Sequence, residues 1–291
     1  MPLSLPRLTP QLSRQLLVSF NLTGTGRTGK PLIWRLGRRG GKRVFEGVGT
    51  MATAHPTQVY LIIADISGYT SFMLANRETL AHGQLIISQL LERVIKEARL
   101  PLKVSKLEGD AALIFGDAAE VDSASDLQLE TRFTAFVEGF KATLDYLIAS
   151  NLCRCAACEN IDKLRLKVFG HYGEALLHNV GPFEELAGVD VILIHRLLKN
   201  SQKSDGYILL TDAIAERLSF SEELEFKACR ESYGDIGDVP ARVHFPSAEL
   251  RNPVAVSFLR RAAHQLHKSF VMVAMILGLK RFPKLGNVLP S

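Results

Sequence analysis

The feature that most constrains the fold is an uninterrupted apolar run, Val59 to Ala64, which ends at Asp65. Such a run is typical of a strand buried on both faces, because successive strand side chains point to opposite sides of a sheet. A second run, Ala111 to Phe115, follows Glu108-Gly109-Asp110. If the two strands are neighbours, the carboxylates of Asp65 and Asp110 face one point.

The remaining patterns predict an α+β domain. Apolar residues recur at helical spacing over residues 80–98 and 127–148, and a hairpin is predicted to turn at Glu108-Gly109. The later elements are expected to be strands over 164–170, 175–180 and 207–210, and helices over 189–198 and after Thr211. The order β-α-β-β-α-β, with an α-β extension, is that of a ferredoxin-like fold.

Charge divides the chain into parts. Its net charge of +5 arises in the first 50 residues, where Lys and Arg far outnumber a single acid, Glu46, so a nucleic-acid-binding domain is not indicated. We predict a basic, mostly disordered leader over residues 1–55, a globular domain over 56–247 and an amphipathic helical tail over 248–291. One hypothesis takes Met51 as the true start and the leader as a gene-model extension; the alternative is a genuine basic tail.

The tail combines a helical apolar stripe with basic residues. A basic amphipathic helix can make peripheral contact with an anionic membrane, and it can equally pack on its own domain or on a partner subunit. The chain has no apolar run of about 18 residues and no secretory signal at its start, which predicts a cytoplasmic protein.

Three of the four cysteines, Cys153, Cys155 and Cys158, lie in one hexapeptide. Closely spaced thiolates are typical of a zinc or iron–sulfur site, and zinc needs a fourth ligand. The alternatives are buried small hydrophobes or redox thiols. The candidates for the fourth ligand are Cys229, His171, His178 and a residue of a second subunit.

The paired aspartates indicate different chemistry. Hard divalent cations such as Mg²⁺ and Mn²⁺ prefer a few carboxylates together with phosphate oxygens. Backbone N–H groups around Ile66, Ser67 and Gly68, where the strand turns toward a helix, are suited to a polyphosphate. The sequence therefore predicts a metal–nucleotide site at the end of the first strand.

Three motifs carry a family resemblance. Residues 65–72 (DISGYTSF), 106–111 (KLEGDA) and 169–181 (FGHYGEALLHNVG) occur in the order of the corresponding motifs of class III nucleotide cyclases. The chain resembles that superfamily over about residues 59–245. It is most similar to an uncharacterised bacterial cyclase-like family with a Cys-x-Cys-x-x-Cys loop.

The resemblance implies roles for individual residues. Asp65 and Asp110, with the backbone of Ile66, would hold Mg²⁺ or Mn²⁺, and Lys106 and Glu185 would contact the purine of ATP or GTP. Lys106 implies adenine. Arg196 would stabilise charge on the transferred phosphoryl group. Cyclase-like domains build their sites between two subunits, so a homodimer is implied.

Two departures from the cyclase pattern bear on turnover. Ile192 stands where cyclases have an asparagine that orients the ribose, and residues 233–238 offer no match to a phosphate-binding lysine. The leading hypothesis is a nucleotide-binding, cyclase-like protein with a degenerate site, which would form a cyclic 3′,5′-nucleotide as an adenylyl or guanylyl cyclase. The alternative is a non-catalytic signalling or interaction module with a vestigial site and a structural zinc loop.

Overall fold

The structure is a computed structural model. It describes residues 24–25, 31–39, 42–50, 55–76, 80–124, 127–153, 155–180, 183–222, 224–246 and 256–277. The chain divides into two compact units, Met1–His55 and Pro56–Ser291.

The first unit contains three strands, β1 (Gly24–Thr25), β2 (Pro31–Arg39) and β3 (Lys42–Thr50). They form one antiparallel sheet in the order β1-β2-β3. The sequence predicted this leader to be mostly disordered, whereas its second half forms a hairpin. The hypothesis that Met51 is the start lies outside what the structure describes and stays a prediction.

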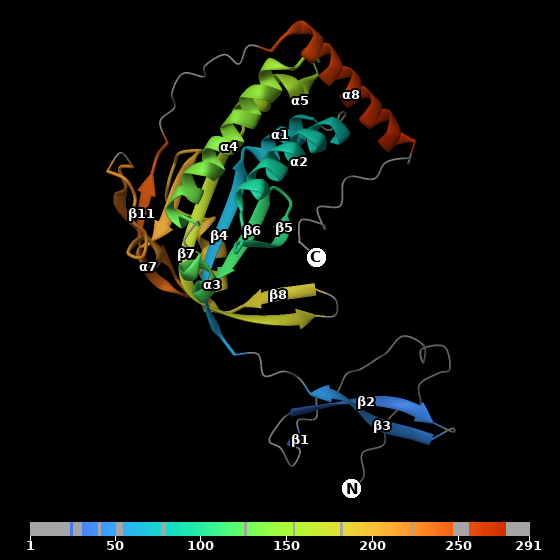
Figure 1. The fold of residues 1–291 in the computed structure, drawn as a ribbon, viewed down its shortest axis with the longest axis vertical. Helices are drawn as coiled ribbons and strands as arrows, with labels where there is room; N and C mark the ends of the chain where they lie inside the picture. The colour runs from blue at the N-terminus through green and yellow to red at the C-terminus, as the bar shows by residue number, and fades with distance from the viewer. Residues whose placement is uncertain are drawn as a thin grey trace. The chain divides into compact units, whose positions relative to one another are not determined.

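The second unit is built on an eight-stranded sheet in the order β10-β11-β9-β7-β4-β6-β5, with β8 paired to β7 (Figure 1). Neighbouring strands are antiparallel except β7 and β9, which are parallel. The strands are β4 (Thr57–Ser67), β5 (Lys103–Glu108), β6 (Ala111–Asp117), β7 (Arg165–Val180), β8 (Phe183–Ala187), β9 (Tyr207–Thr211), β10 (Lys227–Tyr233) and β11 (Gly237–His244).

Helices separate these strands in the predicted order. Two long helices, α2 and α4, pack together and cover one face of the sheet (Figure 1). The helices are α1 (Tyr69–Ala75), α2 (Leu80–Glu97), α3 (Ala118–Ser123), α4 (Leu129–Ala149), α5 (Ala156–Glu159), the 3-10 turn η2 (Ile161–Lys163), α6 (Val189–Leu197), α7 (Asp212–Ala215) and α8 (Phe258–Ile276). The strand order β7-β4-β6-β5 with α2 and α4 between them is that of a β-α-β-β-α-β fold, which confirms the predicted α+β, ferredoxin-like class.

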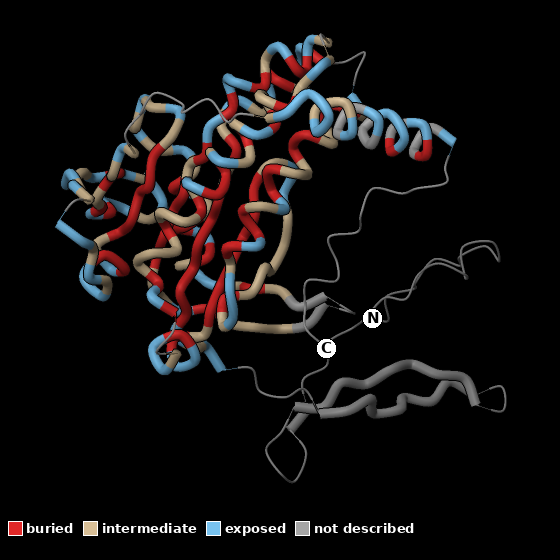
Figure 2. The backbone as a smooth tube through the Cα atoms, turned by 45° about the horizontal axis from the view of Figure 1, so that its top comes forward, coloured by how far each residue is buried: buried red, intermediate tan, exposed pale blue. Residues whose placement is uncertain are grey.

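Strand β4 separates two hydrophobic cores, as the apolar run predicted. Its even-numbered residues from Tyr60 to Ile66 pack with α2 and α4, and its odd-numbered residues from Val59 to Ile63 pack with α6. Figure 2 shows the buried segments running along the central strands. Because Asp65 continues the odd-numbered series, it lies on the α6 face of the sheet.

One predicted pair of strands is wrong. Residues 164–170 and 175–180 belong to the single strand β7, and the hairpin to β8 turns only after Val180. The glycines between them are required by packing: a Cβ on Gly170 would lie 2.6 Å from Leu210 and 2.9 Å from Phe133, and one on Gly173 would lie 2.3 Å from Asp190. Glycine within a strand here marks close approach of neighbours and not a turn.

Helix α8 turns much of its apolar stripe to solvent. Leu259, Leu266, Phe270 and Leu277 are all more than 60% exposed, whereas Val271 and Ala274 are buried. Both predicted occupants of the exposed stripe, a partner subunit and an anionic membrane surface, stay predictions. Within the described part of the chain, no helix combines the length and apolar character needed to span a bilayer.

The crowding at Gly170 generates a prediction. Gly170→Ala should lower the free energy of unfolding by about 1–3 kcal/mol, because the added methyl group meets two rigid, buried side chains. Gly234→Ala is the control, since nothing lies within 4 Å of the place its methyl group would take, and it should change stability by less than about 0.5 kcal/mol. Chemical denaturation measures both; equal effects would contradict the packing argument.

Candidate functional site

The predicted nucleotide-binding residues lie on one face of the sheet, beside α6. Asp65 pairs with Ala111 of β6 on one side and Lys167 of β7 on the other, and Lys106 and Glu108 pair with Leu113 and Ala111. Since directly paired residues share a face, Asp65, Lys106 and Glu108 project to the same side. The pairing of β6 and β7 with β4, and of β5 with β6, therefore places these side chains on one face of the sheet.

Asp65 and Asp110 lie together at the end of β4. The backbone N–H of Ile66 donates to the carbonyl oxygen of Asp110 at 3.1 Å, which fixes the hairpin tip beside the strand end. Gly109 has a φ of +67°, a left-handed conformation that suits glycine in this tight turn. No ion pair to either carboxylate occurs among the residues that the structure describes.

Burial disfavours ionisation of both carboxylates. The pKa of Asp65 is raised to about 6, first by burial and second by the charge of Asp110, while Lys167 acts in the opposite direction. Burial also raises the pKa of Asp110. Two half-buried carboxylates that have no ion pair among the described residues are the electrostatic condition that a bound divalent cation would relieve.

The residues predicted to hold phosphate are placed less favourably. Gly68 precedes the seven-residue helix α1 with a φ of +86°, and Ser67 Oγ donates to Asp205 Oδ1 at 3.4 Å. The N–H of Ile66 is already used by Asp110. The predicted metal contact of the Ile66 backbone, and the phosphate contacts of Ser67 and Gly68, stay predictions.

Lys106 and Glu185 come together from β5 and β8. Lys106 Nζ lies 2.9 Å from Glu108 and 3.9 Å from Glu185, and Glu108 lies 3.7 Å from His195 Nδ1 on α6. The pKa of His195 is lowered, chiefly by burial, with Glu108 opposing the shift and Lys106 adding to it. Glu108 therefore lies between Lys106 and His195, with its side chain 44% exposed.

Arg196 and Ile192 lie on the same helix, α6. Arg196 Nη2 forms a 2.5 Å ion pair with Asp235, and the side chain of Ile192 is 53% exposed. Asp190, two residues before Ile192, contacts strand β7. Its carboxylate accepts from the N–H of Glu174 at 2.7 Å and lies 3.1 Å from His171 Nε2.

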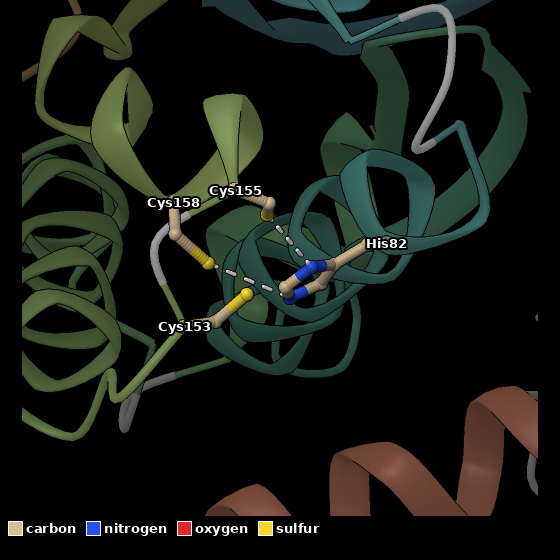
Figure 3. Close-up of side chains that lie close together, drawn as sticks. All are labelled: His82, Cys153, Cys155 and Cys158. Carbon is tan, nitrogen blue, oxygen red and sulfur yellow. Dashed lines mark hydrogen bonds between the residues drawn. The ribbon is translucent and has the colours of Figure 1, made fainter.

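The cysteine loop forms a second cluster. The ligand atoms of His82, Cys153, Cys155 and Cys158 all lie within 4.8 Å of one another, a grouping that could hold a metal ion (Figure 3). His82 Nδ1 lies 3.2 Å from Cys155 Sγ, and His82 Nε2 lies 3.6 Å from Cys158 Sγ. The four residues come from the first turn of α2 and from the loop around α5.

The fourth member of this cluster differs from every residue that the sequence suggested. The two ring nitrogens of His171 contact Thr211 and Asp190. Cys229 lies in β10, and His178 lies in β7 where it pairs with β8. None of these three belongs to the cluster. The sequence did contain a signal for His82. This histidine lies four residues before Ile86 on the buried face of α2, where a polar side chain is unusual.

Comparisons with known proteins give limited functional information. Residues 87–207, less than half of the chain, match a family described as a protein of unknown function, DUF2652. An uncharacterised protein of Mycobacterium tuberculosis, Rv2561/Rv2562, is 38% identical over 138 residues. That match covers 46% of this chain and 61% of the relative.

The chain is also similar to solved structures of nucleotide cyclases, at low sequence identity. The catalytic core of a rhodopsin-guanylyl cyclase with converted specificity, in complex with ATPαS, has 15% identity and a TM-score of 0.48, covering 68% of this chain and all of that one. The guanylyl cyclase Cya2 has 14% identity and a TM-score of 0.48, with coverages of 68% and 97%. An adenylate/guanylate cyclase/hydrolase from Silicibacter pomeroyi has 15% identity and a TM-score of 0.46, with coverages of 67% and 100%. Likenesses at this level assign no activity to this chain.

The raised pKa of Asp65 generates a pH prediction for metal-free protein. An aspartate in the unfolded chain has a pKa of about 3.9, so the folded state retains a proton that the unfolded state loses between about pH 4 and pH 6. Stability should therefore fall as pH rises through this window. Asp65→Asn should be about 2–3 kcal/mol more stable than wild type at pH 7.5 and show no advantage below about pH 4.

Urea denaturation in EDTA across this pH range measures the effect. Glu92→Gln, which changes a carboxylate that is 51% exposed on α2, is the control and should follow wild type. Parallel pH profiles for wild type and Asp65→Asn would contradict the assigned burial and repulsion.

Proposed function

We propose that this chain is a class III cyclase-like protein that binds a purine nucleoside triphosphate together with Mg²⁺ or Mn²⁺. The observation that carries the proposal is the placement of Asp65 and Asp110 side by side at the end of β4, with a pKa of about 6 for Asp65. The order of the three cyclase-like motifs supports the same interpretation.

The donor set fits a hard divalent cation. Carboxylate oxygens are the ligands that Mg²⁺ and Mn²⁺ prefer, and the cation is usually completed by substrate phosphates and water. In a cyclase such ions activate the ribose 3′-hydroxyl and neutralise the triphosphate. Asp65 and Asp110 would hold them, and the raised pKa of Asp65 means that cation and proton compete for that carboxylate.

The base-facing side of the proposed site is Lys106 with Glu185. Lys106 Nζ and a carboxylate oxygen of Glu185 lie 3.9 Å apart. The pair therefore offers one hydrogen-bond donor and one acceptor side by side, which suits the polar edge of a purine. We assign ATP or GTP as the ligand, with adenine favoured by the resemblance of Lys106 to the lysine of adenylyl cyclases.

The site is proposed to lie between two copies of this chain. Asp65 and Asp110 of one subunit would face Glu185 and Arg196 of the other, as in cyclase-like domains. On α6, Val189 is 68% exposed and Ile192 is 53% exposed, so this helix presents apolar surface beside Arg196 that a partner subunit would cover.

Turnover is proposed to be poor. The exposed Ile192 offers no hydrogen bond to a ribose, and Arg196 is neutralised by its ion pair with Asp235. Loss of one such polar group typically costs about 10²–10³ in rate, because phosphoryl transfer depends on positioning and preorganised charge. The same two observations favour the second candidate, a non-catalytic signalling or interaction module.

Nucleotide binding separates the two candidates. Wild-type protein should bind ATP or GTP only with Mn²⁺ or Mg²⁺ present, and Asp65→Asn/Asp110→Asn should weaken binding by more than about tenfold because the metal loses both carboxylates. Isothermal titration calorimetry measures this, with Glu92→Gln as the control. Absence of metal-dependent binding by the wild type would leave the non-catalytic module.

The degenerate positions generate a gain-of-function prediction. Ile192→Asn/Asp235→Asn should form cyclic nucleotide at least about tenfold faster than wild type, because it restores an amide and releases Arg196. Ile192→Leu/Asp235→Asn is the matched control, since it releases the arginine without adding an amide. Cyclic AMP and cyclic GMP are measured by chromatography; equal rates for both double variants would reject the role assigned to position 192.

A further inference from the structure

The cluster of His82, Cys153, Cys155 and Cys158 lies away from the proposed nucleotide site. Cys158 is a member of the hydrophobic core formed with α2 and α4, and Cys153 and Cys155 pack against that core, whereas Asp65 lies on the opposite face of the sheet. We propose that these four residues form a structural zinc site, in which one histidine nitrogen and three thiolates complete a tetrahedral coordination.

The distances fit that geometry. Zinc–sulfur bonds of about 2.3 Å and zinc–nitrogen bonds of about 2.0 Å place neighbouring tetrahedral ligand atoms about 3.5–3.8 Å apart. His82 Nδ1 lies 3.2 Å from Cys155 Sγ, and the other ring nitrogen, Nε2, lies 3.6 Å from Cys158 Sγ. With one ligand atom taken from each residue, a single histidine nitrogen and three sulfurs, all four atoms lie within 4.8 Å of one another. Shifts of about 1 Å or less in side-chain atoms therefore bring all four ligands to tetrahedral spacing.

The backbone holds the three cysteines in place without a metal. The N–H of Cys158 donates to the carbonyl of Cys155 at 2.9 Å, so the turn of α5 sets these two residues on one side. Asn151 clamps Cys153, because its Oδ1 accepts from the N–H of Cys153 at 3.0 Å and its Nδ2 donates to the carbonyl oxygen at 2.8 Å. A backbone ordered in this way loses little conformational freedom when the cysteines bind an ion.

The donor types select zinc. Thiolate and imidazole ligands favour Zn²⁺ over Mg²⁺, Ca²⁺ or Mn²⁺, which prefer oxygen. All three cysteines are reduced, and His82 and Cys158 are buried, at 4% and 8% exposure. Four protein ligands leave no open position for a substrate, so the site is structural and not catalytic.

The site joins parts of the chain that are distant in sequence. His82 belongs to the first turn of α2, and the cysteines belong to the segment that continues through α5 into η2. A Cβ added to Gly68 would lie 3.3 Å from the carbonyl oxygen of Lys163 in η2, so this segment packs directly on the turn between β4 and α1. Zinc would hold that segment against α2 and against the end of β4.

Metal content of the purified chain tests the assignment. Wild type, prepared under reducing conditions, should contain one zinc per chain by inductively coupled plasma mass spectrometry. His82→Gln and Cys155→Ser should lose at least about nine tenths of it, since three ligands bind zinc far more weakly than four. His178→Gln and Cys229→Ser change the same residue types outside the cluster and should keep the full content.

Cobalt substitution keeps the test decisive if the loss variants fold poorly. Wild type reconstituted with Co²⁺ should show the visible bands of tetrahedral cobalt together with thiolate-to-cobalt charge transfer. His82→Cys supplies a fourth thiolate and should keep one metal per chain, with charge-transfer absorbance about one-third higher. Unchanged spectra in both His82 variants would show that His82 is not a ligand and overturn the proposal.

The remaining outcomes also decide the matter. Wild type that takes up neither zinc nor cobalt, or that contains a disulfide within residues 153–158 by thiol counting, rejects the zinc site. Asp65→Asn/Asp110→Asn should keep its zinc whatever its nucleotide affinity, so failure of the nucleotide proposal is distinguishable from failure of this one. Hydrogen exchange should show residues 151–163 losing protection in His82→Gln and not in His178→Gln.

Discussion

The pairing of β4 with β6 on one side and β7 on the other is the interaction on which the rest of the second unit depends. It builds the centre of the sheet, separates the two hydrophobic cores and ends with the 3.1 Å hydrogen bond from Ile66 to Asp110. That last contact forces two carboxylates together at a half-buried position. The free energy gained by burying the apolar strands therefore keeps the two carboxylates close together despite their electrostatic repulsion. In the unfolded chain the two carboxylates would separate.

The two candidate metal sites differ in the type of their ligand atoms and in the role proposed for the metal. The oxygen-donor pair, Asp65 and Asp110, is incomplete by itself and suits a cation that arrives with phosphate oxygens. The cluster of three cysteines and His82 supplies all four ligands from the chain and suits a resident zinc ion. The two are linked by the segment from α5 to η2, which packs on Gly68 immediately after the aspartate strand.

The sequence predicted the fold because its strongest signals are local. The apolar run of β4, the helical spacing of α2 and α4, and the turn at Gly109 each depend on a few neighbouring residues. It also predicted that Asp65 and Asp110 would meet, because antiparallel pairing relates strand ends directly. It predicted two strands where the structure has the single strand β7, in which Gly170 and Gly173 leave room for Phe133 and Asp190, residues from other elements.

Other features of the sites could not be predicted because they depend on tertiary contacts. His82 reaches the cysteine loop only when α2 and α5 pack together, and no spacing in the sequence relates the two segments. The ion pair of Arg196 with Asp235 and the placement of Glu108 beside His195 are likewise products of the folded sheet.

The ionisation of Asp65 is the property that most directly reports the paired-carboxylate site. Its side-chain carboxyl carbon can be followed by nuclear magnetic resonance as pH is varied, with Asp65→Asn used to assign the signal. In EDTA the midpoint should lie at about 6, and saturating Mg²⁺ with ATP or GTP should move it to lower pH as the cation displaces the proton. A midpoint near the ordinary aspartate value of about 4, unchanged by Mg²⁺ and nucleotide, would contradict the account.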